Sequence, residues 1–402
     1  MTLQAAQFTT ARASQPGWYG WINRALGWLP SRRLDAQQWI ARAEAAIGGT
    51  VDPSVVQACE ALVASLEADA SLSLLGRVGA ASDTQRMLQT HLQVQAALQA
   101  GACVEASALP NPVYVLGWMR SGTTALHRML AVDDASWAPM HHEALFPVAP
   151  AGADDRPARV EKVLADLARV SPHYQAIHRM APNEAEECRN LFMHAMRTLQ
   201  FSVQYRIPGY EAWLATQDPR VAYGHYIDQL RLLRHHRPTG TRMLLKDPMH
   251  LGHVDVLLER FPGAKFVFIH RDPVRVLSSM SSMYAYTRAI FSDRVDPTTI
   301  GPELFDASLL DAHAFALAQC DALPSGRVVH VRHADLREDP AGVAERIYGD
   351  LDLPWTPELG DAMASKIRDE PRHAHAHAPE AFGLEPASMR ERLAGYCKRF
   401  DL

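Results

Sequence analysis

Residues 113–130 read Val113-Tyr-Val-Leu-Gly117-Trp-Met-Arg120-Ser-Gly122-Thr-Thr-Ala-Leu-His-Arg-Met-Leu130. The first four residues are apolar and partly β-branched, which predicts a buried strand that ends at Gly117. Apolar residues then recur at helical spacing from Ala125 to Leu130. A strand, a glycine-bounded loop and a helix present backbone N–H groups and the positive end of a helix to an anion. This stretch therefore predicts an anion site at the carboxyl end of a strand.

The side chains of the loop suit the same purpose. Gly122 lets an oxyanion approach the backbone closely, and Thr123 and Thr124 supply hydroxyl donors. Arg120 adds a fixed charge that can bond an oxyanion through two N–H groups. The loop nearly matches the nucleotide-binding motif Gly-x4-Gly-Lys-Ser/Thr, but Thr123 stands where the lysine belongs. This departure counts against an ATPase or kinase, and an ordinary strand-to-helix turn is the alternative interpretation.

Two further strand-like runs end in cationic residues. Lys265-Phe-Val-Phe-Ile-His270 is followed by Arg271, Asp272 and Pro273, and Pro273 suits the first position of a helix. Arg271 would lie at the carboxyl end of its strand, where open α/β sheets bind ligands. Ser279 follows on the helix, and a third run, residues 243–246, is a short strand that ends at Lys246.

Together these pieces resemble the sulfotransferases that use 3′-phosphoadenosine 5′-phosphosulfate (PAPS). The stretch Arg120-Ser121-Gly122-Thr123-Thr124 resembles their 5′-phosphosulfate loop, and Arg271 with Ser279 resembles their 3′-phosphate motif. Lys246-Asp-Pro and residues 261–272 are similar to the tyrosylprotein sulfotransferases and a bacterial branch related to them. The resemblance implies PAPS as co-substrate, no metal, and transfer of a sulfuryl group to a hydroxyl or amine acceptor.

The resemblance, which runs from about residue 111 to 355, also implies the fold. We expect an α/β protein of the P-loop type, with three layers around a central parallel sheet, and strands near 113–117, 136–140, 242–246, 265–270 and 327–332. Helical patterns predict an N-terminal extension over residues 1–108, followed by the α/β domain over 109–402 with a helical insertion at about 150–240. Expected helices include 34–47, 53–66, 83–100, 158–170, 184–200, 222–234 and 340–350.

Sulfuryl transfer needs cations near the reacting oxygens and an acceptor for the proton of the attacking hydroxyl. The resemblance assigns the cations to Arg120 and Lys246, although Lys246 could instead be a structural partner of Asp247 or Asp272. It assigns the proton to Glu143, which follows Arg120 by 23 residues.

Histidines compete with Glu143 for this role because histidine is the commonest general base. His141 and His142 are adjacent to it, and His194 is a further alternative. A surface ion pair is the structural interpretation of Glu143 itself.

Three other stretches bear on the nucleotide. Ser278 and Ser282 lie near Ser279 and compete for its assignment. His333 replaces the tyrosine of the family's Tyr-Glu-Asp-Leu segment near the adenine, which weakens the case for a contact there. His373, His375 and His377 alternate, yet no acidic residue or cysteine is adjacent to complete a metal site. A loop that folds over the nucleotide is the better interpretation, and Arg372 in it could reach the 3′-phosphate.

Composition narrows the class of protein. The 402 residues carry a net charge of −5, which is no footprint of general nucleic-acid binding. Five scattered cysteines predict reduced thiols in a cytoplasmic protein. No signal peptide or membrane-spanning run is apparent. Trp18 and Trp21 lie in a short N-terminal helix that docks onto the core or touches a membrane or partner.

The sequence leaves several questions open. The acceptor is a small molecule, a lipid, a glycan or a peptide, and the oligomeric state is undetermined. The alternative functions are a catalytically inactive protein that binds PAP, the 3′-phosphoadenosine 5′-phosphate left when PAPS loses its sulfuryl group, and a P-loop kinase. The intact Arg120, Lys246 and Glu143 count against the first, and the missing lysine in the loop counts against the second.

Overall fold

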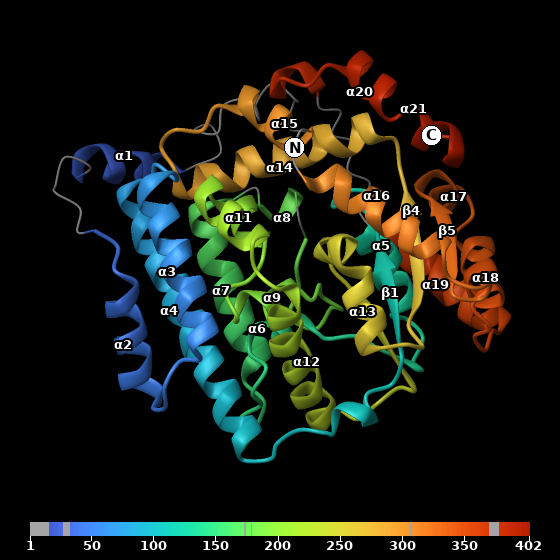
Figure 1. Ribbon diagram of the computed structural model, residues 1–402, viewed down its shortest axis with the longest axis horizontal. Coiled ribbons are helices and arrows are strands. Elements are labelled where there is room, and N and C mark those ends of the chain that lie inside the picture. The colour runs from blue at the N-terminus through green and yellow to red at the C-terminus, as the bar shows by residue number, and fades with distance from the viewer. Residues whose placement is uncertain (1–15, 27–32, 173, 178, 306–307, 370–377) are drawn as a thin grey trace.

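A parallel sheet of five strands lies at the centre of the computed structural model, which describes residues 16–26, 33–172, 174–177, 179–305, 308–369 and 378–402 (Figure 1). The strand order is β2-β3-β1-β4-β5, so the first sequence motif forms the central strand, as predicted. The strands are β1 (Pro112–Leu116), β2 (Ser136–Trp137), β3 (Arg242–Lys246), β4 (Lys265–His270) and β5 (Val328–Arg332). The second strand is shorter than the expected 136–140.

Both faces of the sheet are apolar, which is typical of a parallel sheet covered on both sides. Tyr114 and Leu116 face one core together with Phe268, whereas Val113 and Val115 face the other. Every residue of β1 is buried. The alternation places consecutive β1 side chains on opposite faces and thus explains why the whole run is apolar.

Helices cover each face and complete the three layers. On the face of Val115, α5 (Thr123–Leu130) packs with α18 (Pro340–Asp350) and α19 (Pro357–Asp369). On the opposite face the core includes side chains of α12 (Pro219–His236), α13 (Val254–Arg260), α14 (Pro273–Phe291) and α16 (Ser308–Asp321). The remaining C-terminal helices are α15 (Pro297–Phe305), α17 (His333–Glu338), α20 (Pro386–Arg392) and α21 (Ala394–Phe400), with 3₁₀ helices at Ala106–Ala108, Pro248–His253 and Pro379–Phe382.

The N-terminal helices form a layer beside this core (Figure 1). They are α1 (Gly17–Leu26), α2 (Ala36–Ile47), α3 (Pro53–Ala68) and α4 (Leu74–Gln99). Helix α4 begins before the expected Asp83 because the Ser73 hydroxyl accepts a bond from Gly76 N, which caps an earlier start. Helices α2–α4 share their hydrophobic cluster with Met193, Phe201 and Tyr210 of the insertion. The division of the chain at residue 108 stays a prediction.

The insertion departs from the expected pattern at residues 184–200, which do not form one helix. Only α9 (Arg189–Met193) and the start of α10 (Gln200–Gln204) are helical there. The backbone before α9 bonds instead to the segment after β2 and to the end of β3, because Glu186 N donates to Pro139 O and Cys188 N donates to Lys246 O, each at 2.9 Å. The other helices of this region are α6 (His141–Leu145), α7 (Arg156–Val170), α8 (Tyr174–Ile177) and α11 (Pro208–Ala215).

None of the helices in these described ranges is both long enough and apolar enough to cross a lipid bilayer.

Candidate functional site

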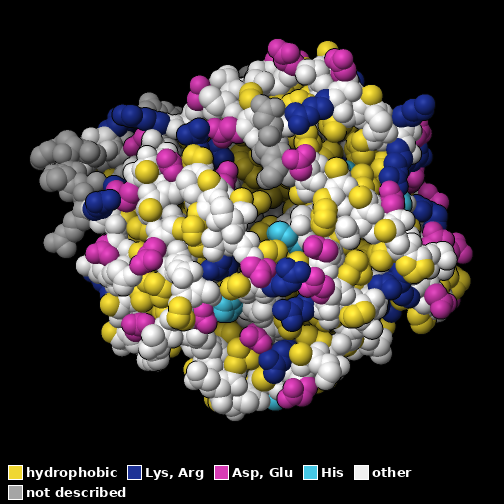
Figure 2. Space-filling model, in the orientation of Figure 1, with side chains coloured by type: hydrophobic (Ala, Val, Ile, Leu, Met, Phe, Trp, Pro, Cys, Tyr) yellow, Lys and Arg dark blue, Asp and Glu magenta, His cyan; other side chains and the backbone are white. Residues whose placement is uncertain are grey.

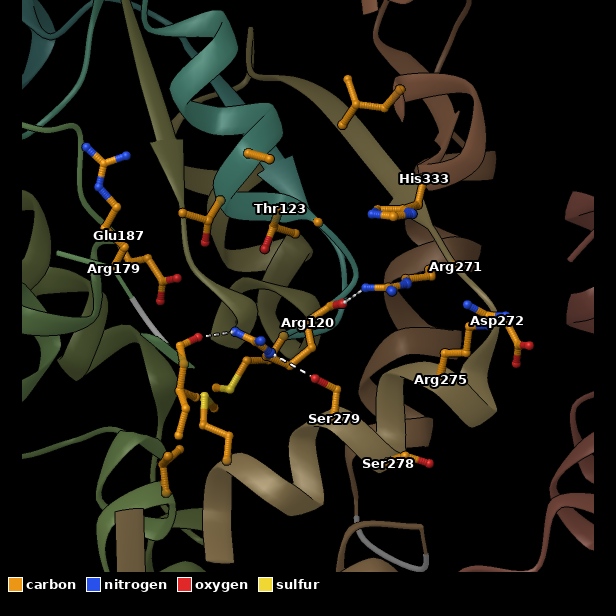
Figure 3. A pocket seen from close by; sticks show the side chains of 18 of the residues that line it. Arg120, Thr123, Arg179, Glu187, Arg271, Asp272, Arg275, Ser278, Ser279 and His333 are labelled. Carbon is orange, nitrogen blue, oxygen red and sulfur yellow. Dashed lines mark hydrogen bonds between the residues drawn. The ribbon is translucent and has the colours of Figure 1, made fainter. Parts of the chain in front are cut away.

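A cavity of about 830 Å³ opens at the carboxyl ends of β1 and β4. The loop after β1, the first half of α14, and residues of α8 and the segment before α9 form its walls. In Figure 3, Glu187 and Arg179 lie on one side of Arg120, and Arg271, Arg275 and His333 lie on the other. The cavity thus joins the sequence motifs to a part of the insertion.

The loop after β1 adopts a conformation that suits an oxyanion. Gly117 has φ = 150°, Arg120 has φ = 71° and Gly122 has φ = 105°, so three residues of the loop have positive φ. The next residues, Thr123 and Thr124, begin α5 and line the cavity, and the first N–H groups of a helix have no partner within it. A Cβ at Gly122 would lie 2.6 Å from His333 Cδ2. Position 122 of the loop therefore has room only for glycine.

The two distant motifs meet at this loop. Because β1 and β4 are neighbouring parallel strands, their carboxyl ends share one edge of the sheet. Arg271 Nη1 donates to the Arg120 carbonyl oxygen at 2.8 Å, and Arg120 Nε donates to Ser279 Oγ at 3.1 Å (Figure 3). The expectation that both arginines lie at the same edge is confirmed.

Positive charge dominates the cavity. Among the described residues that line it, eight are arginines and two are carboxylates. Burial lowers the pKa of Arg271, and the neighbouring Arg120 and Arg275 guanidinium groups lower it further. Burial also lowers the pKa of His333 to about 4, with Arg271 as the next cause. Crowded cations in a sheltered site favour an anionic ligand, because its charge would relieve their repulsion. The arginines are Arg120, Arg128, Arg179, Arg189, Arg271, Arg275, Arg337 and Arg390, and the carboxylates are Glu187 and Asp272.

Lys246 joins the loop to the insertion. It is 1 % exposed and lies behind the cavity wall, where Nζ donates to Thr124 Oγ1 at 3.1 Å and forms an ion pair with Glu187. Its neighbour Asp247 is buried, and burial followed by the Glu187 charge raises the Asp247 pKa to about 7. The partner of Lys246 is thus Glu187, rather than the Asp247 or Asp272 considered from the sequence.

Glu187 is the carboxylate that sequence reasoning missed. It lines the cavity, whereas the only functional candidate that the sequence indicated within the predicted helix 184–200 was His194. The cluster of Glu184, Glu186 and Glu187 after Pro182 was the available signal. Which of these three carboxylates reaches Lys246 depends on the hydrogen bond from Cys188 N to Lys246 O, because this bond brings Glu187 beside the lysine.

Glu143 lies elsewhere and is not among the residues that line the cavity. It is part of α6, not the end of a strand, and its Oε2 accepts a bond from Met140 N at 2.8 Å. Arg237 Nε donates to Glu143 Oε1 at 2.8 Å, and Arg237 Nη2 lies 2.7 Å from Oε2. Glu143 is thus an ion-pair residue, but it is 4% exposed, so it is buried and not on the surface as the structural interpretation predicted.

The histidines that competed with Glu143 also lie outside the cavity lining. His142 Nδ1 donates to Pro182 O at 2.9 Å, and His194 Nδ1 donates to Gln229 Oε1 at 2.7 Å. His141 is buried 3.9 Å from a Glu186 oxygen, and burial lowers its pKa.

The remaining predicted residues divide between the cavity and its surroundings. Ser278 lines the cavity, but its hydroxyl donates to Val274 O within its own helix, whereas Ser282 does not line it. Ser121 is buried behind the loop, where its hydroxyl donates to Trp118 O at 2.7 Å. Arg372 and His373, His375 and His377 lie outside the described residues. Within the described ranges, no group of three histidine, cysteine or carboxylate side chains could hold a metal ion.

Comparison with known proteins agrees with this geometry. A model of the sulfotransferase family matches residues 112–357, more than half of the chain. The omega-hydroxy-beta-dihydromenaquinone-9 sulfotransferase Stf3 of Mycobacterium tuberculosis is 28% identical over 254 residues, which cover 60% of this chain and 63% of that protein. The chain thus matches less than two thirds of that relative's length.

Two solved structures share the fold over almost the whole chain. Sulfotransferase STF1 from Mycobacterium tuberculosis superposes with a TM-score of 0.78 at 25% identity, covering 90% of this chain and 99% of that one. Sulfotransferase STF9 from Mycobacterium avium gives a TM-score of 0.80 at 21% identity, covering 93% and 98%. With the family model, these findings establish that the chain belongs to the sulfotransferase family.

Proposed function

We propose that this protein transfers a sulfuryl group from PAPS to the terminal hydroxyl group of a lipid. The observation that carries the proposal is the convergence of Arg120, Arg271 and Ser279 in one cavity. They come from two motifs far apart in the chain. A single nucleotide that carries phosphates on both the 5′ and the 3′ oxygen of its ribose would require both motifs.

The residues present fit such a nucleotide. The N–H groups at the start of α5, with Thr123 and Thr124, suit the 5′-phosphosulfate. Arg271 and Ser279 suit the 3′-phosphate, and Arg275 lies beside them in the cavity. Burial makes these contacts stronger than they would be in water, because the local dielectric is low.

PAPS, when bound, would supply the sulfuryl group; the protein supplies charge, position and a base. Arg120 would stabilise the negative charge that grows on the bridging oxygen as the sulfur–oxygen bond to the phosphate breaks, and Lys246 would add its charge from behind the cavity wall. Lys246 is directed toward the loop by Thr124. The walls of the cavity would hold the acceptor hydroxyl in line with that bond.

We assign the proton acceptor to Glu187 in place of Glu143. Glu187 lines the cavity and is paired with Lys246, so a proton acceptor and a cation for the leaving oxygen would be held side by side. The acceptor hydroxyl would give its proton to this carboxylate as its oxygen bonds to sulfur. The carboxylate of Glu143 is already paired with Arg237. Glu143 is the alternative proton acceptor, and mutation of each residue would distinguish the two.

A lipid acceptor is supported by the apolar part of the cavity. Its apolar lining residues include Met119, Ile177, Val203 and Met283. Arg120 Nη1 donates to Ile177 O at 3.1 Å, so this apolar part adjoins the reacting end. The Stf3 relative is named for a menaquinone lipid with a terminal hydroxyl, which is the same class of acceptor.

The decisive experiment measures nucleotide selectivity by calorimetry. PAP should bind roughly 10²-fold more tightly than ADP without Mg²⁺, since two hydrogen bonds to a charged group contribute ~1.5–3 kcal/mol each before desolvation. Arg271→Ala should remove most of that advantage and leave ADP binding unchanged. If ADP binds the wild type as tightly as PAP does, the proposal fails, and tighter binding of Mg·ATP would favour a kinase.

Turnover separates an enzyme from an inactive PAP-binding protein. Labelled PAPS should transfer its label to a polyprenyl or alkyl chain with a terminal hydroxyl, and less to a soluble phenol. We also propose that the protein is related to the tyrosylprotein sulfotransferases. A cytoplasmic location is proposed as well, and the five free cysteine thiols support it.

A further inference from the structure

Helix α1 exposes large apolar side chains. Trp18 is 48% exposed and Trp21 is 64% exposed, one turn apart on a helix of ten residues. Leu26, at the end of the same helix, is 41% exposed. Val78, on the first turns of α4, is 60% exposed and lies one turn beyond Leu75, whose N–H donates to Asn23 of α1. Four of the seven large apolar side chains exposed on the described part of the chain thus gather around α1.

The sequence around α1 is rich in arginine. Residues 1–34 carry four arginines and no acidic residue, although the whole chain has a net charge of −5. Arg24 and Arg33 are exposed. Figure 2 shows dark-blue Lys and Arg side chains where α1 lies in Figure 1. Tryptophan with arginine on a short amphipathic helix is the composition that binds the interface of an anionic bilayer.

Contacts to the core fix this helix near the cavity. The Tyr19 hydroxyl donates to Ile290 O of α14, and Asn23 accepts from Leu75 N at 3.0 Å. Met283, seven residues before Ile290 on α14, lines the cavity, which places it about 10 Å along the helix axis from that contact. Figure 2 shows a hollow lined with apolar side chains below α14, where α8 lies in Figure 1.

We infer that α1 docks the protein on the surface of an anionic membrane, with Trp18 and Trp21 in the interface. This inference rests on the proposed lipid acceptor, because docking would set the apolar part of the cavity close to the bilayer that holds such a molecule. Tyr19 and Asn23 are buried and hold α1 against the core, whereas its aromatic face is exposed. This arrangement is expected of a helix that binds a surface outside the protein.

The test is sedimentation of the full chain with vesicles, without nucleotide. The wild type should bind vesicles of phosphatidylglycerol at least about tenfold more tightly than vesicles of phosphatidylcholine, and the binding should weaken with salt. The double variant Trp18→Ala/Trp21→Ala and the charge variant Arg24→Glu/Arg33→Glu should each lose at least about tenfold of this affinity. Val163→Ala removes an exposed apolar side chain on α7 and should change nothing.

The outcomes separate docking from catalysis. All variants should keep wild-type affinity for PAP, because α1 does not line the cavity. A wild type that fails to bind PAP would sink the proposed function while leaving vesicle binding measurable. Docking is overturned if the wild type binds neither kind of vesicle, or if the tryptophan variant binds the vesicles as tightly as the wild type does. A wild-type dimer that the tryptophan variant dissociates, without vesicle binding, would overturn it in favour of self-association.

Discussion

Arg120 Nε donates a hydrogen bond of 3.1 Å to Ser279 Oγ across 159 residues of chain. The bond connects the loop after the central strand to the helix after its neighbour, so the two motifs form one surface. Arg271 reinforces it by donating to the Arg120 carbonyl oxygen, which holds Arg120 in its left-handed conformation. Ser279 can therefore influence both ends of the proposed nucleotide site.

Ser279→Ala should weaken PAP binding about tenfold, since it removes one hydrogen bond to a charged group. Ser278→Ala is the matched control, because the Ser278 hydroxyl already donates to Val274 O. It should change the affinity by less than about twofold. Calorimetric titration of both variants checks this, and equal losses would show that the two serines are not distinguished by their orientation.

Glu187→Gln should lower kcat by roughly 10²-fold or more and leave PAP binding nearly unchanged, because the amide cannot take a proton. Glu143→Gln weakens the ion pair with Arg237 and should instead lower the melting temperature with a smaller effect on kcat. Single-turnover kinetics with labelled PAPS and thermal melts separate the two. The reverse pattern would restore Glu143 to the role that the sequence suggested.

Gly122→Ala should reduce PAP affinity by about tenfold or more. An alanine at φ = 105° is strained, and its Cβ would meet His333 Cδ2 at 2.6 Å. The double variant Gly122→Ala/His333→Ala removes the contact but not the strain, so it should recover part of the loss. A double variant no better than the single one would show that backbone conformation alone sets the requirement for glycine.

Stability should fall as the pH decreases from about 6.5 toward 4. Burial lowers the pKa of five core histidines to about 3 or 4, namely His91, His127, His194, His250 and His313. In this window the unfolded chain binds more protons than the folded one, so acid favours unfolding. Asp247, with its pKa raised to about 7, acts in the opposite direction but is one group against five.

The melting temperature should therefore drop by about 5–10 °C between pH 7 and pH 5. His194→Asn keeps a donor for Gln229 and should flatten this dependence, whereas the exposed His235→Asn should not. A wild type equally stable at both pH values would contradict the assignment of these histidines as buried and neutral.

Gly76→Ala should destabilise the protein strongly, because its Cβ would lie 1.8 Å from Phe291 O where α4 crosses α14. A backbone atom cannot yield as a side chain does, so a cost of about 1–3 kcal/mol or more is expected. Gly224→Ala, in α12 with nothing within 4 Å, should stabilise by about 0.5–1 kcal/mol. Urea denaturation measures both, and like signs would refute the close crossing.

The sequence by itself determined the pieces whose signals are local. Residues 113–130 predicted the central strand, its loop and α5, and Arg271 with Ser279 predicted the end of β4 and the face of α14. An apolar β-branched run, a glycine and a helical period are properties of neighbouring residues, so they can be read without the fold. Because parallel strands share one edge for their carboxyl ends, the meeting of Arg120 and Arg271 also followed.

Only the tertiary structure decided which carboxylate reaches the cavity. Glu187 does so because Cys188 N bonds to Lys246 O, and Glu143 does not because Arg237, 94 residues later, takes its carboxylate. These pairings join residues that no local period relates, and they outweigh the helical pattern of residues 184–200 because backbone groups buried beside a sheet must be hydrogen-bonded. The acidic residue that the resemblance indicated, Glu143, is therefore not the one that reaches the cavity.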